Sequence, residues 1–220
     1  SSTSRGLGDV YKRQALLETK SSGKGQVIDA AMTDGSSLLM TMMYSMHQSG
    51  FWNLERQTNL LDGAAHFYDT YECKDGKFVS IGSIEPQFYA LLCEKAGLSQ
   101  DDFGDQMKRD TWNEKKELIK KVFITKTRDE WCELMEGTDV CFAPVLDMSE
   151  APKHPHNVAR KTFIELEGIT QPAPAPRFDR TINEITLPPA LAGEHSKEIL
   201  ESLDLNEEEM NSLLATGSVV

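Results

Sequence analysis

The segment from Met32 to His47 is apolar nearly all the way round, and this most restricts how the chain can fold. Its apolar residues fall on two helical faces, one with Leu39, Met43 and Met46 and the other with Leu38 and Met42. A helix without a polar face is buried in a core or an interface. The sequence therefore predicts one buried helix over Met32–His47.

Charge and cysteine usage narrow the possible partners and compartments. The 220 residues carry 23 Lys and Arg against 35 Asp and Glu, a net charge of −12. This balance argues against nucleic acid or an anionic membrane surface as a partner, because both attract clustered cations. No apolar stretch approaches the roughly 18 residues that a membrane span needs. The four cysteines show no C-x-x-C spacing, which predicts free thiols in a cytoplasmic protein, with a peroxisome or mitochondrion open as alternatives.

The stretch from residue 59 to residue 150 has the clearest local patterns. His66–Glu72 and Lys77–Ser83 alternate apolar and polar residues, and the sequence Lys74-Asp75-Gly76-Lys77 between them is typical of a turn. This arrangement predicts a β-hairpin. The elements predicted after it are a helix from Pro86 to Gly97, helices over Asp110–Ile124 and Thr127–Glu136, and an edge strand over Val140–Leu146 that contains Pro144.

The two flanks are less regular. Ala15–Lys20 is typical of the end of a helix, stopped by Ser21–Gly25, and Gln26–Ala30 is typical of a short strand. Pro152–Pro189 is rich in proline and lacks periodicity, which predicts an extended tail. Two C-terminal helices are predicted, over Glu194–Leu203 and over Glu207–Ala215 with Asn206 as its cap.

The local sequence alone identifies one residue as a candidate catalytic group. Glu85 directly follows a predicted strand and precedes Pro86, at the start of a helix. Its carboxylate is either an anion interacting with the helix dipole or a group able to orient a base or act as one, and composition does not choose. The pair His154 and His156 lies in a proline-bounded loop without a third ligand at useful spacing, so no metal site is predicted.

Several motifs, in the right order, resemble one enzyme family. They are Gly23–Met32, Asn59–Gly63, Phe67–Tyr71, Ile84–Tyr89, Trp131–Asp139, Cys141–Leu146, Pro174–Phe178 and Gly193–Leu200. Together they resemble the α-methylacyl-CoA racemases, a branch of the family III CoA-transferase superfamily. The resemblance covers the chain from Ala15 to its last helix.

The resemblance implies an α/β protein with a Rossmann-like large domain and a small α+β domain. It also implies an interlocked homodimer whose active site lies between subunits. The implied reaction inverts the 2-methyl centre of an acyl-CoA thioester through an enolate-like intermediate. It needs two bases and neither a metal nor a cofactor, since CoA is part of the substrate.

The opening residues and the resemblance together divide the chain into four segments. Residues 1–14 are predicted to be a non-native leader, and residues 15–58 to be the end of a large-domain segment with the buried helix. Residues 59–150 are predicted to form the small domain with its hairpin and helices. Residues 151–220 are predicted to be a proline-rich tail and C-terminal helices that return to the large domain.

The family's two bases, a His in G-H-D and an Asp in G-D-F-G-G-G, have no counterpart in this sequence, so the chain alone is expected to be inactive. Glu85 matches the family's glutamate that pairs with the catalytic His. The residues expected to bind the acyl chain are Met32, Met42, Met46, Leu60, Leu61, Tyr68 and Ile84. For the methionines, flexible core filling is the competing interpretation.

Two departures from the family pattern and two alternative functions stay open. The chain has Ala64 and His66 where the family usually has Gly and Pro, which changes the demands on that loop's conformation. A role for His66 as a substitute base is disfavoured because no residue is predicted to orient it. One alternative is a family III CoA-transferase, although those enzymes tend to carry N-D-x-Q-F where this chain has Glu85-Pro86-Gln87-Phe88. The other alternative is a non-catalytic subunit that keeps the fold without the bases.

Overall fold

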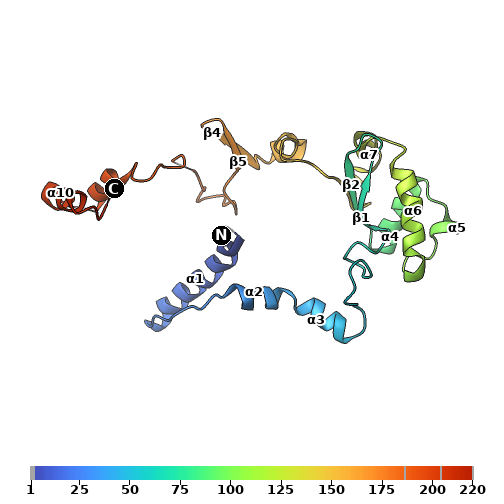
Figure 1. Ribbon diagram of the computed structural model, residues 1–220, viewed down its shortest axis with the longest axis horizontal. Coiled ribbons are helices and arrows are strands. Elements are labelled where there is room, and N and C mark those ends of the chain that lie inside the picture. The colour runs from blue at the N-terminus through green and yellow to red at the C-terminus, as the bar shows by residue number, and fades with distance from the viewer. Residues whose placement is uncertain (1–2, 186, 204, 220) are drawn as a thin grey trace. The chain divides into compact units, whose positions relative to one another are not determined.

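A computed structural model describes residues 3–185, 187–203 and 205–219 of the chain (Figure 1). The chain divides into two compact units, Ser1–Val145 and Leu146–Val220, and each is described by itself. The first unit contains helices α1 to α7 and a three-stranded sheet, and the second contains a two-stranded sheet with short helices. No helix of the described residues is both long and apolar enough to cross a bilayer.

The chain begins with helix α1, Thr3–Ser22, which runs across the predicted boundary between residues 14 and 15. Gly23 ends it in the left-handed region at φ +71, with its N–H donated to the carbonyl of Thr19 at 2.8 Å. The predicted helix end is therefore confirmed. The strand predicted over Gln26–Ala30 is wrong, because this segment is extended but pairs with no other described strand.

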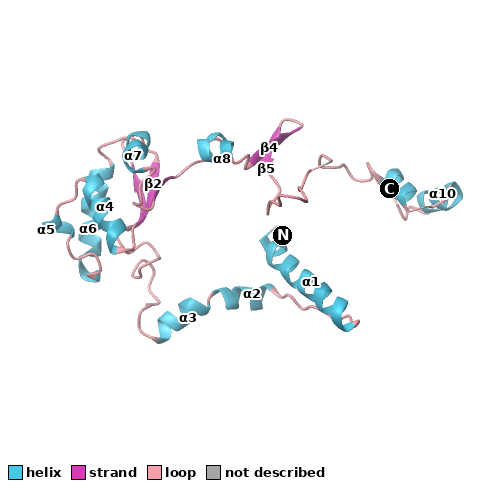
Figure 2. Ribbon diagram, turned by 180° about the vertical axis from the view of Figure 1, so that it is seen from behind, coloured by secondary structure: helices cyan, strands magenta, loops and turns pink. Residues whose placement is uncertain are grey.

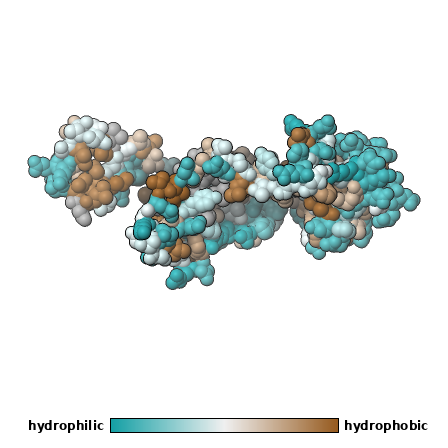
Figure 3. All heavy atoms as spheres, turned by 90° about the horizontal axis from the view of Figure 1, so that it is seen from below, coloured by the Kyte–Doolittle hydropathy of each residue, from teal (hydrophilic) through white to brown (hydrophobic). Residues whose placement is uncertain are grey.

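The apolar segment that follows forms two helices, α2 (Met32–Leu39) and α3 (Thr41–Gln48), instead of one. They separate at Met40, where the Thr41 hydroxyl donates to the carbonyl of Leu38 at 2.6 Å and competes with the helical bond. No residue of either helix is buried. The prediction of one buried helix over Met32–His47 is thus wrong for the described chain, since no other described segment covers these faces. Exposed apolar side chains also form several patches on the face shown in Figure 3.

The predicted hairpin is confirmed as β1 (Tyr68–Glu72) and β2 (Phe78–Gly82), two antiparallel strands with Thr70 opposite Ser80. Gly76 takes φ +73 in the turn, and Cys73 donates its N–H to the Lys77 carbonyl at 2.7 Å. Strand β3 (Phe142–Pro144) pairs with the other side of β2, giving the order β1-β2-β3. This confirms the edge strand with Pro144, although it is shorter than predicted. Figure 2 shows β2 in magenta, with the cyan helices α4, α6 and α7 near it.

Helices follow β2 much as predicted. They are α4 (Pro86–Ala96), α5 (Gln100–Phe103), the short 3-10 helix η1 (Arg109–Thr111), α6 (Trp112–Phe123) and α7 (Arg128–Met135). Pro86 occupies the first turn of α4 and Gly97 ends it at φ +68. The capping box of Thr127 and Glu130 is present at the start of α7.

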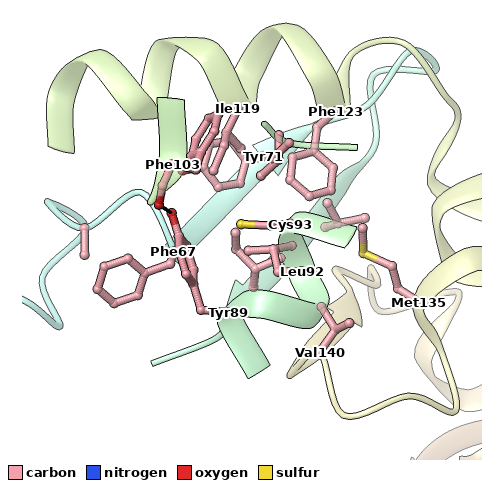
Figure 4. Packing of buried hydrophobic residues seen from close by; sticks show 14 of the residues in the cluster. Phe67, Tyr71, Tyr89, Leu92, Cys93, Phe103, Ile119, Phe123, Met135 and Val140 are labelled. Atoms are coloured by element: carbon pink, nitrogen blue, oxygen red, sulfur yellow. Dashed lines mark hydrogen bonds between the residues drawn. The ribbon is translucent and has the colours of Figure 1, made fainter. Parts of the chain in front are cut away.

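These helices and the sheet enclose one hydrophobic core, the hairpin core, whose buried residues come from the segment 64–140 of the sequence. Figure 4 shows its centre, where side chains from the strands meet those of α4 and α6. The Tyr71 and Phe123 rings stack with centroids 5.2 Å apart, and Trp131 lies at 4.9 Å from Phe123. The Trp131 indole donates to the Phe123 carbonyl at 2.8 Å, which satisfies its polar atom inside the core.

The second unit holds more structure than the sequence predicted. The tail expected to be extended contains η2 (Ala151–Lys153), α8 (Pro155–Ala159) and an antiparallel hairpin of β4 (Phe163–Leu166) and β5 (Ile169–Pro172). Its turn places Glu167 at φ +50 and Gly168 at φ +77, as a two-residue hairpin turn requires. The C-terminal helices are confirmed as α9 (Ser196–Ser202) and α10 (Glu207–Ala215), the second with Asn206 in a capping box.

Candidate functional site

Glu85 lies at the N-cap of α4, where its backbone is extended at φ −71 and ψ 142. Its carbonyl accepts the N–H of Tyr89 at 3.0 Å, so its backbone starts the helix. Its side chain is exposed and makes no capping hydrogen bond. The carboxylate therefore does not serve as the local cap of α4 and is available to another group.

The backbone that leads into Glu85 is held on both sides. Gly82 donates its N–H to the Cys141 carbonyl at 2.9 Å, and Ser83 donates its N–H to the Phe67 carbonyl at 3.0 Å. The hydroxyl of Ser83, which is fully buried, donates to the carbonyl of Val140. Gly82 and Ser83 are thus bonded to segments that precede β1 and that lead into β3, and Glu85 projects from a rigid junction.

An open hollow of about 550 Å³ lies beside the sheet on the side of the loop before β1. Its lining residues are Leu61, Asp62, Gly63, Tyr68, Asp69, Thr70, Ser80, Ile81, Gly82, Cys141, Phe142 and Ala143. Cys141 is a non-glycine residue at φ +58, and such strained backbone is concentrated at functional sites. Cys141 is exposed, but partial desolvation raises the pKa of its thiol, and the negative charges of Glu85 and Asp139 raise it further.

The loop that carries Leu60 and Leu61 is fixed by two polar side chains, the buried Asn59 and the partly buried Asp62. The Asp62 carboxylate accepts the N–H of Asn59 at 2.8 Å and its side-chain amide at 2.8 Å. Burial alone would raise the pKa of Asp62, but these hydrogen bonds lower it overall. Asn59, only 1% exposed, also bonds both the N–H and the carbonyl of Asn53. The loop is therefore preorganised by its own side chains.

Helix α6 holds the same loop from the other side. The Lys116 ammonium lies 2.5 Å from the Asp69 carboxylate of β1 and donates to the carbonyl of Gly63. The Lys116 side chain is only 15% exposed, so this contact is partly shielded from water. Lys116 thereby joins a helix, a strand and the loop at the edge of the hollow.

His66 is completely buried, in contact with Phe67, Tyr89 and Phe103. Its Nε2 lies 2.7 Å from the Tyr89 hydroxyl, which itself donates to the Phe103 carbonyl at 2.9 Å. Tyr89 thus orients the ring, contrary to the expectation that no residue would. Burial, with the positive charges of Lys115 and Lys116, lowers the pKa of His66 to about 3. A buried, neutral ring has no access to a substrate proton, which argues against a role as a base.

The structure brings some of the predicted acyl-binding residues together. Leu61 and Tyr68 line the hollow, while Leu60 and Ile84 pack against the hairpin core. The three methionines lie on α2 and α3 and are not part of this lining; Met32 is 73% and Met42 54% exposed, and Met46 is half-buried.

Other residues at the site were missed by sequence reasoning. Cys141 and Asp69 line the hollow, and Lys116 contacts two lining residues, Asp69 and Gly63. These contacts join elements far apart in the chain, and no local pattern marks them. In the described part of the chain, no group of three or more His, Cys, Asp or Glu side chains is placed to hold a metal ion.

Comparison with known proteins gives consistent matches along most of the chain. The family model of CoA-transferase family III matches residues 11–196. Alpha-methylacyl-CoA racemases of Mus musculus and Homo sapiens are 41% and 42% identical over 202 residues, which are 90% of this chain and 53% of each relative. The succinyl-CoA:glutarate CoA-transferase of Homo sapiens is 25% identical over 219 residues, 93% of this chain and 49% of the relative. The chain thus spans about half the length of these curated relatives.

A solved structure has a similar fold. The crystal structure of a CAIB/BAIF family protein from Brucella suis superposes with a TM-score of 0.66 at 18% sequence identity. The match covers 89% of this chain and 52% of that one. At this identity the likeness concerns the fold alone.

Proposed function

Because this chain belongs to the CoA-transferase family III, we propose that it is the C-terminal portion of an α-methylacyl-CoA racemase. The family predicted from the sequence is confirmed, and so is a mixed helix and sheet fold of that family. Among the relatives compared, the racemases are about 17 percentage points more identical to this chain than the human CoA-transferase, 42% against 25%. This difference favours racemization over CoA transfer.

The proposed reaction inverts the 2-methyl centre of an acyl-CoA thioester. One base removes the α-proton, an enolate-like thioester forms, and an acid returns a proton to the opposite face. The His and Asp motifs that the family uses for these steps do not occur in this sequence. We therefore propose that the chain alone is inactive and that it completes a site whose bases come from elsewhere in the racemase.

Glu85 is the group that this chain contributes to the proton transfers. The observation that carries the proposal is its exposed carboxylate, which the helix cap does not use, on a junction fixed by backbone hydrogen bonds. Such a carboxylate accepts the ring N–H of a catalytic His, fixes the tautomer and orients the ring. It therefore serves the base without touching the α-carbon.

The acyl chain is proposed to lie against the hollow and its neighbours. Leu61 and Tyr68 supply apolar surface there, with Leu60 and Ile84 beside them. Exposed Met32 and Met42, with Met46, form the adaptable wall in the assembled enzyme, since methionine fits chains of variable shape. A homodimer, an intracellular compartment and the lack of a metal or cofactor are parts of the same proposal.

The test uses the full-length gene product that contains this chain. In deuterated water, the wild-type protein should exchange the α-proton of a 2-methylacyl-CoA and racemize it, while residues 1–220 alone should incorporate no deuterium. Glu85→Gln should lower kcat about 100-fold with little change in KM, because it disturbs the base and not substrate binding. Glu94→Gln, a change in the same helix at a side chain 70% exposed, is the matched control and should leave kcat unchanged.

Unchanged turnover in Glu85→Gln would contradict the role given to Glu85. Transfer of CoA from the thioester to a free acid, without α-proton exchange, would identify a CoA-transferase instead. A full-length protein that performs neither reaction would favour the non-catalytic subunit.

A further inference from the structure

The side chain of Gln106, in the loop between α5 and η1, bonds the backbone just before Glu85. Its Nε2 atom lies 2.9 Å from the carbonyl oxygen of Ser83 and 2.9 Å from that of Ile84. A primary amide has two N–H bonds, so this geometry uses both of them on two consecutive carbonyls. These two carbonyls lie just before the start of α4, in the junction that is also held by the Gly82 and Ser83 N–H groups and the Ser83 hydroxyl.

Gln106 is itself held in place from α6. The indole of Trp112 donates to the Gln106 carbonyl at 2.8 Å, and the Lys115 ammonium donates to the Asp105 carbonyl at 2.6 Å. Both donors are nearly buried, Trp112 at 2% and Lys115 at 5% exposed. An unbroken series of hydrogen bonds therefore runs from α6 through Gln106 to the peptide groups that precede Glu85.

We infer that Gln106 is a positioning residue that fixes the direction in which Glu85 projects. The Ile84 carbonyl lies in the peptide plane that joins Ile84 to Glu85, so a bond to this oxygen restrains rotation of that plane. Rotation of the plane would swing the Cα–Cβ bond of Glu85 and displace its carboxylate. The effect of this restraint on turnover rests on the proposed function, whereas the restraint itself does not.

Cys141 provides a readout of the Glu85 position that needs no enzymatic activity. The negative charge of Glu85 contributes to raising the pKa of the Cys141 thiol, after burial. The thiol is exposed and its segment is bonded to Gly82, so its alkylation rate as a function of pH reports the carboxylate nearby. Peptide-resolved mass spectrometry separates Cys141 from the buried Cys73 and Cys93.

The experiment is a double-mutant cycle in the 220-residue chain, with iodoacetamide as the probe. Glu85→Gln should lower the pH of half-maximal alkylation of Cys141, because a negative charge is removed. In the background of Gln106→Met, which keeps the size but removes both donors, this shift should fall by at least half. Gln106→Glu, which presents acceptors to the two carbonyls, should have the same effect and provides a second variant if the first unfolds. Gln100→Met, an exposed glutamine of α5, is the control and should retain the full shift.

An equal, non-zero Glu85→Gln shift in all backgrounds would overturn the inference. If Glu85→Gln causes no shift in the wild-type background, the Cys141 thiol does not sense the carboxylate, and the kinetic comparison of Gln106→Met with Glu85→Gln tests the coupling instead. Kinetics of the full-length gene product then separate the two proposals. Gln106→Met should lower kcat about 10-fold with KM little changed, and no further loss should follow when Glu85→Gln is added beyond that of Glu85→Gln alone. If the thiol cycle shows coupling but neither variant changes turnover, Gln106 positions Glu85 and the proposed function is wrong.

Discussion

The Nε2 atom of His66 carries the proton that bonds the Tyr89 hydroxyl, since Tyr89 gives its own proton to the carbonyl of Phe103. The Nδ1 atom of His66 is buried and has no hydrogen-bond partner among the residues that the structure describes. Protonation of this atom would place a charge in the hairpin core beside Lys115 and Lys116, which explains the lowered pKa. The folded state therefore favours the neutral form of His66.

This arrangement predicts a stability loss in acid. The pKa of His66 is about 3 in the folded chain against 6.5 for an ordinary histidine, so the unfolded state binds the proton first. The contribution of neutral His66 to the free energy of unfolding is fully present above pH 6.5. It decreases by about 1.4 kcal/mol per pH unit as the pH falls toward 3. Urea unfolding at pH 5 and pH 7 should show a steeper decline for the wild type than for His66→Leu. Equal declines would mean that His66 is not held neutral.

Removal of the Lys116 contact should destabilise the hairpin core. Lys116→Met leaves the Asp69 carboxylate and the Gly63 carbonyl without their shared donor, which should lower the free energy of unfolding by about 1 to 3 kcal/mol. Lys120→Met removes an exposed ion pair with Glu117 on the same helix and should change it by less than about 1 kcal/mol. Denaturant titration of both variants checks this, and equal effects would assign no special role to Lys116.

Substitution of Gly76 tests whether the β1–β2 turn needs a residue without a Cβ. The φ of +73 at Gly76 is strained for any residue with a Cβ, although a Cβ there would meet no atom within 4 Å. Gly76→Ala should therefore lower the free energy of unfolding by about 1 to 2 kcal/mol through backbone strain alone. Gly25→Ala is the control, since Gly25 has open space and an ordinary φ, and thermal unfolding should leave it near the wild type. A neutral Gly76→Ala would show that the turn adapts.

The contrast between the hairpin core and the apolar helices gives a further test. Ile119 of α6 is completely buried, so Ile119→Ala should destabilise the chain by about 2 to 5 kcal/mol. Leu39 of α2 is 73% exposed, so Leu39→Ala should change the stability of the isolated chain by less than about 0.5 kcal/mol. A large effect of Leu39→Ala in chemical unfolding would mean that α2 packs on a neighbour in solution.

Local sequence patterns predicted the helices and strands that are determined by a few neighbouring residues, such as a turn sequence or a helix cap. The β1–β2 hairpin follows from strict alternation around Asp75-Gly76, and α7 follows from the Thr127 and Glu130 capping box. The β4–β5 hairpin had a similar signal in Glu167-Gly168, but the proline content around it obscured the alternation. The segment therefore resembles an extended tail in composition although two of its stretches pair as strands.

Longer-range features could not be predicted in the same way. The break at Met40 depends on a Thr41 side-chain bond that competes with the helix, and the burial of α2 and α3 depends on what lies beside them. Glu85 could be identified as a candidate from its position between strand and proline. The residues that hold it, above all Gln106, depend on how the loop before η1 folds back onto the β2–α4 junction.

The pairing of β2 with two very different partners has a consequence for the order of folding. β1 is joined to β2 by a short turn, whereas Pro144 of β3 meets Val79 only after four α-helices and one 3-10 helix have intervened. Hairpins close in about 1 to 10 μs, but a loop of this length carries a larger closure entropy and forms its contacts late. We expect β1 and β2 to pair early and β3 to dock last. The Val140 and Cys141 carbonyls that restrain the Glu85 junction then arrive at the final step, so the candidate site is completed only when the whole core has folded.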